Sequence, residues 1–98
     1  MELSILRRVV RKHGANCLLN DKPLIFWCLQ NYKALKWLLK QSINPNEEIC
    51  IRDDKRVTAL WLAKHQTGAL HWQKVRRLLR KYGAASIRYS DFVSINIH

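Results

Sequence analysis

The sequence predicts an all-α fold built from stacked antiparallel helix pairs with hairpin-like loops. Three stretches of similar length carry apolar residues at helical spacing, a basic run closes each of them, and a small residue or turn follows. The chain has 98 residues, of which 48% are hydrophobic, enough for one modest core. We therefore expect a single domain over residues 1–98, with approximate units 1–20, 21–56 and 57–98.

The apolar periodicity and Pro23 predict four helices, apart from any that a family resemblance adds. Pro23 suits the first turn of a short apolar helix because its φ is already fixed near the helical value. The other three are amphipathic, with core-facing stripes at Ile5, Leu6, Val9 and Val10; at Ala34, Leu35, Leu38 and Leu39; and at Val75, Leu78, Leu79 and Tyr82.

The ends of the three amphipathic helices are also marked. Gly14 and Gly83 follow the first and last basic runs, where a helix cap with positive φ favours glycine. Ser42 stands at the equivalent place in the middle copy and is a poorer terminator.

The last residues have a different period. After Ala85 the apolar residues alternate with polar ones, at Ile87, Tyr89, Val93, Ile95 and Ile97. The pattern predicts either a short C-terminal β-hairpin or an extended tail. An exposed edge over 92–97 would allow self-association by strand pairing, and the alternative is that the tail caps the last unit.

The segment Thr58-Ala59-Leu60-Trp61-Leu62-Ala63 resembles the opening signature of the ankyrin repeat, T-P-L-H-x-A. A second, weaker copy begins at Lys22, 36 residues earlier, and the resemblance covers about residues 3 to 85. It implies two and a half divergent units of paired helices. The signature histidine is replaced by Ile25 and Trp61, and the connection from Ser42 to Thr58 is long enough to project as a loop.

The resemblance implies a non-enzymatic protein-protein interaction module, because loop tips and inner helices form the usual recognition surface of that family. A domain of this size suits a small inhibitor, an immunity protein or an adaptor. The partner is then another protein with an acidic surface, since the net charge is +11. The predicted contact residues lie in the long loop and at two tryptophans: Arg52, Asp53, Asp54, Lys55, Arg56, Trp61 and Trp72.

An alternative function follows from where the charge lies. The three amphipathic helices hold 12 of the 18 Lys and Arg residues and no acidic residue. Like charges four residues apart repel on a helix, a cost that a bound anion would offset. The ankyrin resemblance implies that the three helices lie side by side on a convex surface, which would then contact nucleic acid or anionic lipid. The predicted anion-binding residues are Arg7, Arg8, Arg11, Lys36, Lys40, Arg76, Arg77, Arg80 and Lys81. Solvated helix backs are the competing interpretation.

No feature of the sequence indicates catalysis, a cofactor, a metal or a small-molecule substrate. The histidines lack metal-ligand spacing, and phosphate-cradling loops and nucleophile motifs are absent. Three cysteines without CxxC spacing favour a reducing compartment, and Cys28 is expected to be a buried, unpaired thiol. Without a signal peptide or transmembrane run, the predicted location is cytoplasmic.

Overall fold

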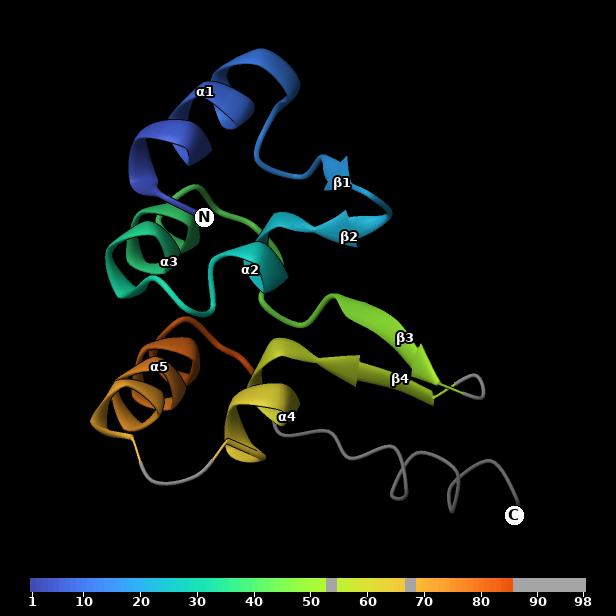
Figure 1. The fold of residues 1–98 in the computed structure, drawn as a ribbon, viewed down its shortest axis with the longest axis vertical. Helices are drawn as coiled ribbons and strands as arrows, with labels where there is room; N and C mark the ends of the chain where they lie inside the picture. Colours follow the sequence, from blue (N-terminus) through green and yellow to red (C-terminus); the bar gives the residue numbers. More distant parts are fainter. Residues whose placement is uncertain (53–54, 67–68, 86–98) are drawn as a thin grey trace.

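The computed structural model describes residues 1–52, 55–66 and 69–85, apart from the side chain of Arg52. The helices of this part are α1 (Leu3–His13), α2 (Leu24–Trp27), α3 (Tyr32–Leu39), α4 (Ala59–Lys64) and α5 (Leu70–Lys81). Two antiparallel hairpins pair β1 (Leu18–Leu19) with β2 (Lys22–Pro23), and β3 (Glu48–Arg52) with β4 (Lys55–Thr58). Figure 1 shows α1, α3 and α5 in a row, the hairpins on the opposite side, and α2 and α4 between.

The predicted all-α, ankyrin-like stack is wrong. The described part contains 5 helices and two antiparallel two-stranded sheets, about 51% helical and 15% strand, which is a mixed α/β fold. The segment expected as a projecting loop between Ser42 and Thr58 contains β3 and β4 instead. Ile49 lies opposite Val57 there, and β-branched residues facing each other across two strands stabilise a hairpin.

The first hairpin turns at two residues that the sequence analysis did not single out. Asn20 and Asp21 have φ of 52° and 62°, and Leu19 pairs with Lys22 on either side of them. A two-residue hairpin loop with positive φ at both residues has a backbone twist that matches the twist of the strands. Asn and Asp tolerate positive φ better than most other residues do.

The core confirms most of the predicted helical stripes. Every predicted residue of the α3 stripe is buried, as are Val75, Leu78 and Leu79 of α5. In α1, Leu6 is fully buried but Ile5 is 47% exposed, so its predicted place on the stripe is wrong. α1 stands at one end of the helical row (Figure 1), and only one of its flanks faces a helix within that row.

The predicted helix ends are confirmed. Gly14 and Gly83 have φ of 90° and 92°, and Ser42 has φ of 60°. Two helices also begin with side-chain caps. Asn31 Oδ1 accepts from the Ala34 N–H at 3.1 Å, and Thr58 Oγ1 accepts from the Trp61 N–H at 3.2 Å. These caps satisfy N–H groups that the helices themselves leave without partners.

Long-range hydrogen bonds join successive parts of the chain. Asn46 Nδ2 donates to the Gly83 carbonyl at 3.2 Å, and the Ala85 N–H donates to Asn46 Oδ1 at 2.7 Å. His71 Nε2 lies 2.9 Å from the Leu29 carbonyl. The first link ties the segment before β3 to the end of α5, and the second ties α5 to the segment after α2, so these bonds fix α5 against the middle of the chain.

The predicted C-terminal hairpin or tail, with its self-association edge at 92–97, lies outside the described residues. The division into units 1–20, 21–56 and 57–98 stays a prediction.

Candidate anion-binding face

Three neighbouring helices carry the cations that the sequence analysis grouped together. α3 contacts both α1 and α5, so it lies in the middle of the row. Eleven of the twelve Lys and Arg residues of these helices are exposed, counting Lys40 at the end of α3. We call these eleven residues the basic face: Arg7, Arg8, Arg11, Lys12, Lys33, Lys36, Lys40, Lys74, Arg77, Arg80 and Lys81.

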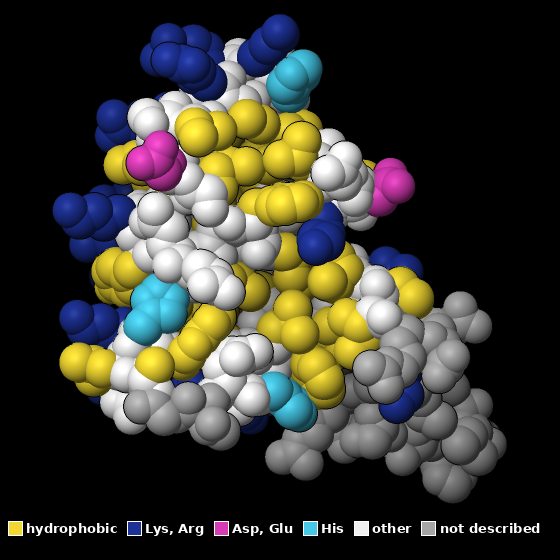
Figure 2. Space-filling view, viewed as in Figure 1, with side chains coloured by type: hydrophobic (Ala, Val, Ile, Leu, Met, Phe, Trp, Pro, Cys, Tyr) yellow, Lys and Arg dark blue, Asp and Glu magenta, His cyan; other side chains and the backbone are white. Residues whose placement is uncertain are grey.

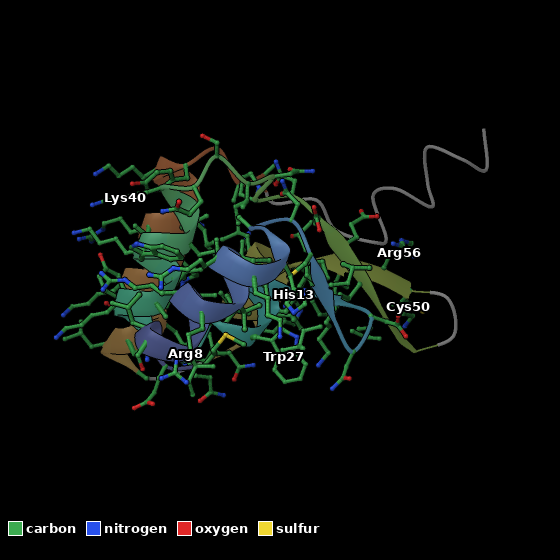
Figure 3. The ribbon with its side chains drawn as sticks, turned by 90° about the horizontal axis from the view of Figure 1, so that it is seen from above. Arg8, His13, Trp27, Lys40, Cys50 and Arg56 are labelled. Atoms are coloured by element: carbon green, nitrogen blue, oxygen red, sulfur yellow. The ribbon has the colours of Figure 1, made fainter. Side chains whose placement is uncertain are left out.

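The views of the molecule show where this charge lies. In Figure 2, Lys and Arg side chains follow the edge formed by the helical row and gather at the end occupied by α1. Figure 3, seen from above, shows nitrogen-tipped side chains extending from the helices on the side opposite the hairpins, with Lys40 labelled there. The folded chain therefore concentrates positive charge on one side.

Within the part of the chain that is described, no ion pair joins a carboxylate to the basic face. The ion pair among these residues lies in the second hairpin, where Arg56 Nε is 3.3 Å from Glu48 Oε1. Several cations on the face are spaced four residues apart, among them Arg7 and Arg11. Each such like-charge pair costs about 0.2–0.5 kcal/mol, a cost that a bound polyanion would remove.

Two grooves run along the basic face, one on each side of α3. The groove between α1 and α3 has a volume of about 360 Å³. Its lining residues are Arg7, Val10, Arg11, Trp37 and Gln41. The Arg7 guanidinium carbon lies 5.8 Å from the centroid of the Trp37 ring, within cation-π range. This groove combines an aromatic ring with two cations.

The second groove lies between α3 and α5 and has a volume of about 400 Å³. Four of its six lining residues are cations: Lys36, Lys74, Arg77 and Lys81. Tyr32 and Leu78 supply its aromatic and apolar parts. Since the backbones hold these cations around one depression, an anion placed there would meet several positive charges at once.

The geometry of α3 explains why it has a groove on each flank. Lys33, Lys36 and Lys40 follow the three- and four-residue spacing that places side chains on one stripe of a helix. The buried residues of α3 occupy the opposite stripe. Trp37 and Tyr32 fall between these stripes on opposite flanks, so a lysine ridge separates two aromatic grooves.

Arg76 has a different position from the other predicted anion-binding residues. It is half-buried, and its Nη1 donates to the Ala63 carbonyl at 3.1 Å and to the Gln66 carbonyl at 3.4 Å. The Ala63 carbonyl lies in the last turn of α4, where helical carbonyls lack intrahelical partners, and Gln66 lies two residues beyond the end of the helix. The structure thus gives Arg76 a role in joining α4 to α5.

We expect neighbouring substitutions at Arg76 and Arg77 to separate stability from binding. Arg76→Ala removes two charge-assisted hydrogen bonds and should lower the free energy of unfolding by about 1–2 kcal/mol. Arg77→Ala, on the exposed side of α5, should change it by less than about 0.5 kcal/mol but weaken polyanion binding. Chemical denaturation and binding titrations of both variants measure the contrast, and equal stability losses would contradict it.

The residues predicted for protein binding are spread over several elements. Asp53 and Asp54 lie outside the described residues, as does the side chain of Arg52. Lys55 and Arg56 are exposed on β4. Trp61 is half-buried on α4 and stacks on His65 with ring centroids 3.8 Å apart. Trp72 packs against the hydrophobic core, which leaves less of it available to a partner.

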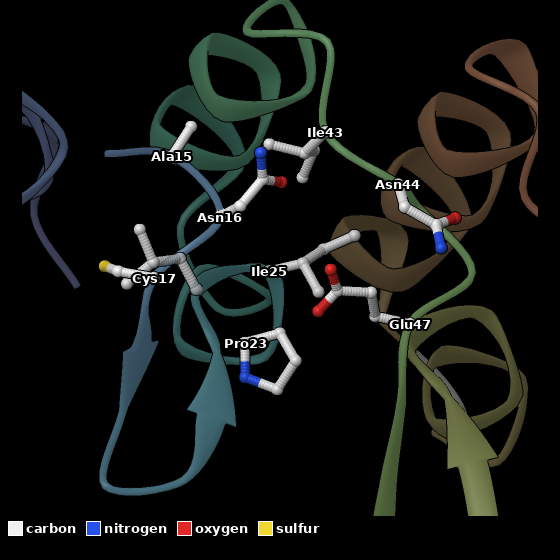
Figure 4. A pocket seen from close by; sticks show the side chains of 9 residues that line it. Ala15, Asn16, Cys17, Pro23, Ile25, Ile43, Asn44 and Glu47 are labelled. Atoms are coloured by element: carbon white, nitrogen blue, oxygen red, sulfur yellow. The ribbon is translucent and has the colours of Figure 1, made fainter. Parts of the chain in front are cut away.

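A small cavity lies between the first hairpin and the segment before β3 (Figure 4). Pro23, Ile25, Ile43 and Glu47 are among its lining residues, and its volume is about 10 Å³. That is about the space of a single water molecule. This cavity therefore has no room for a small-molecule substrate.

Comparisons with known proteins add no assignment: neither a family model, nor a curated protein, nor a solved structure matches this chain. The ankyrin resemblance accordingly stays a prediction from the residues quoted above. Among the described residues, no helix has the length and apolar character to cross a membrane. The same residues hold no group of three or more His, Cys, Asp or Glu side chains arranged to bind a metal ion.

Neither Tyr32 nor Trp37 is among the site residues predicted from the sequence. Trp37 does pack against the core, yet it also lines a groove on the basic face. The signal for Tyr32 was its position directly after the capping residue Asn31 and four residues before Lys36, which places it beside the lysine ridge.

Proposed function

We propose that this protein binds nucleic acid through the basic face, chiefly by contacts with phosphates. The observation that carries the proposal is the set of eleven exposed cations on three adjacent helices, with no carboxylate partner in the described part of the chain. Lysine and arginine are the main phosphate contacts of nucleic-acid-binding proteins. Release of condensed counterions makes such binding favourable at low salt.

Nucleic acid fits this face better than an anionic membrane does. A helical domain lying on a membrane inserts a contiguous apolar surface beside its cations. The large apolar residues that are exposed among the described residues are Ile5, Leu18, Ile51 and Leu70. Ile5 and Leu70 lie on α1 and α5, at opposite ends of the helical row, and Leu18 and Ile51 lie on the hairpins across the molecule (Figure 1). The helices of the basic face therefore do not combine these residues into one inserting surface.

Titration of a fluorescently labelled oligonucleotide at several salt concentrations tests the proposal. If about 6–10 phosphates are neutralised, affinity should fall roughly 10³–10⁵-fold between about 50 and 200 mM salt. Anionic lipid vesicles form a parallel arm. Absence of oligonucleotide binding at about 50 mM salt, or binding to vesicles alone, would overturn the proposal.

A second function is proposed for the opposite side of the molecule, where the β3–β4 hairpin projects away from the helical row (Figure 1). Ile51, Lys55 and Arg56 are exposed there, and Trp61 lies on the helix that follows β4. This side could hold a protein partner in the manner of a small inhibitor, immunity protein or adaptor. Affinity purification with nuclease present, using wild type and Trp61→Ala, tests it; recovery of the same protein by both would contradict this surface.

A further inference from the structure

We propose that the basic face selects single-stranded over double-stranded nucleic acid, by stacking bases on Trp37 and Tyr32 in the grooves beside α3. The inference rests on the proposed function and specifies its ligand. Single-strand binding proteins combine a cationic track for the backbone with aromatic platforms for the bases. The three helices supply both parts on one surface.

The groove between α1 and α3 has the composition of a base-stacking site. Its volume is about 360 Å³, whereas a single water molecule needs about 10–15 Å³ in the same measure, so the groove has room for a group much larger than water. Trp37 offers a half-buried ring that the core holds in place. The Arg7 guanidinium carbon lies 5.8 Å from the centroid of this ring. A base that stacks on Trp37 takes the place of this exposed guanidinium, which then pairs with the phosphate of the same nucleotide.

The groove between α3 and α5 repeats this combination. Tyr32 lies among Lys36, Lys74, Arg77 and Lys81 around a volume of about 400 Å³. The two grooves lie on opposite flanks of α3, and packed helices are about 8–10 Å apart. A single strand crossing α3 would therefore place its phosphates on the ridge of Lys33, Lys36 and Lys40, and neighbouring bases in the two grooves.

A duplex cannot use these features. Its bases are already paired and stacked on one another, so they are unavailable to Trp37 and Tyr32. The major groove is about 12 Å wide and admits one helix, which is itself about 10–12 Å across. α3 has a neighbouring helix on both sides, so it cannot enter that groove. A duplex would meet only the cations of the face.

Competition binding at fixed salt tests the inference, with single strands and duplexes of equal length in both DNA and RNA. We expect single strands to bind about 10-fold more tightly than duplexes, and the DNA and RNA arms show which single strand is preferred. Trp37→Leu should reduce single-strand affinity about 10-fold, the range of one lost stacking contact, and change duplex affinity less than about 2-fold. Trp27→Leu, at the end of α2, replaces another half-buried tryptophan that packs against the core. It lies outside both grooves, so it is the matched control and should alter neither affinity.

Because Trp37 also packs against the core, Trp37→Phe provides a folded variant that keeps a ring. This variant should retain most of the single-strand affinity. In the wild type a base stacked on Trp37 quenches its fluorescence, and this part of the quenching should be missing in Trp37→Phe. Equal affinities for single strand and duplex, or equal losses of both in Trp37→Leu, would overturn the inference and leave the proposed function standing. Failure of both ligands to bind would overturn the proposed function itself.

Discussion

Replacing Lys33, Lys36 and Lys40 together by glutamine is expected to weaken nucleic-acid binding by two to three orders of magnitude at about 0.1 M salt. These residues form the ridge of α3, between the two grooves. Each neutralised phosphate changes the salt slope by about 0.7–0.9, equivalent to a factor of about 5–8 in affinity at 0.1 M salt. Three lost contacts therefore multiply to roughly 100–500-fold.

The same variant should change the salt dependence and not the fold. The slope of log K against log salt should become shallower by about 2–3. Glutamine has nearly the helix propensity of lysine, and the substitution removes the repulsion between Lys36 and Lys40. Its thermal unfolding midpoint should therefore equal or slightly exceed that of the wild type.

A control of equal net charge distinguishes the basic face from the overall charge. Lys22, Lys55 and Arg56 lie on the hairpins, and replacing all three by glutamine also lowers the net charge by three. In this control the slope of log K against log salt should change by less than about one third of the change expected for the α3 variant. The reason is that long-range attraction is screened beyond about 10 Å at 0.1 M salt. Equal losses in the two variants would show that binding depends on net charge and would contradict a localised site.

The helical part of this fold could be predicted because its signals are local. Stripes such as Ala34, Leu35, Leu38 and Leu39 recur from one helical turn to the next. The three helix ends carry residues that adopt positive φ. The position of the cations followed from the same periodicity. Adjacent placement of α1, α3 and α5 then turned three separate stripes into the basic face.

The hairpins could not be predicted in the same way because their signals are short and divided. β1 and β2 have two residues each, too few to show alternation. In β3 and β4 the β-branched residues Ile49, Ile51 and Val57 stand among charged residues, and the segment was predicted to be a long projecting loop. Pairing of Ile49 with Val57 is a contact between segments, and no local pattern in either strand specifies it.

Arg76 illustrates a limit of sequence reasoning about the candidate site. Arg76 and Arg77 are neighbours in one basic run, and nothing in that run separates their roles. The difference arises because α4 ends beside α5, placing the Ala63 and Gln66 carbonyls within reach of one guanidinium. Tertiary packing, which the local sequence does not show, therefore makes Arg76 a link between α4 and α5 and leaves Arg77 exposed on the basic face.

Cys28 is expected to make the free energy of unfolding depend on pH in the alkaline range. Its predicted burial is confirmed, with no exposed surface. Burial disfavours the thiolate and raises the pKa of Cys28 from 9.0 to about 11, against a smaller lowering effect of the N-terminal ammonium. Below pH 9 the thiol is protonated in both states, so its contribution to stability is fully present.

Between pH 9 and 11 the unfolded chain loses the Cys28 proton while the folded chain keeps it. Stability from this group therefore falls as pH rises, by about 1.4 kcal/mol per pH unit and about 2–3 kcal/mol over the window. Cys28→Ala should be less stable than wild type at about pH 8, because it removes a buried sulfur. The difference between the two should shrink or reverse by pH 11.

Urea unfolding at intervals between about pH 8 and 11 measures this effect, and comparison of variants cancels the titration of lysines and tyrosines that they share. Cys50→Ala is the matched control, because Cys50 is exposed and its removal should leave the pH profile parallel to that of the wild type. Alkylation gives a second readout: since the thiolate is the nucleophile, Cys50 should react with iodoacetamide at about pH 8 while Cys28 stays protected. Parallel profiles for wild type and Cys28→Ala, together with rapid alkylation of Cys28 in the folded protein, would show that the thiol reaches solvent and that burial does not control its ionisation.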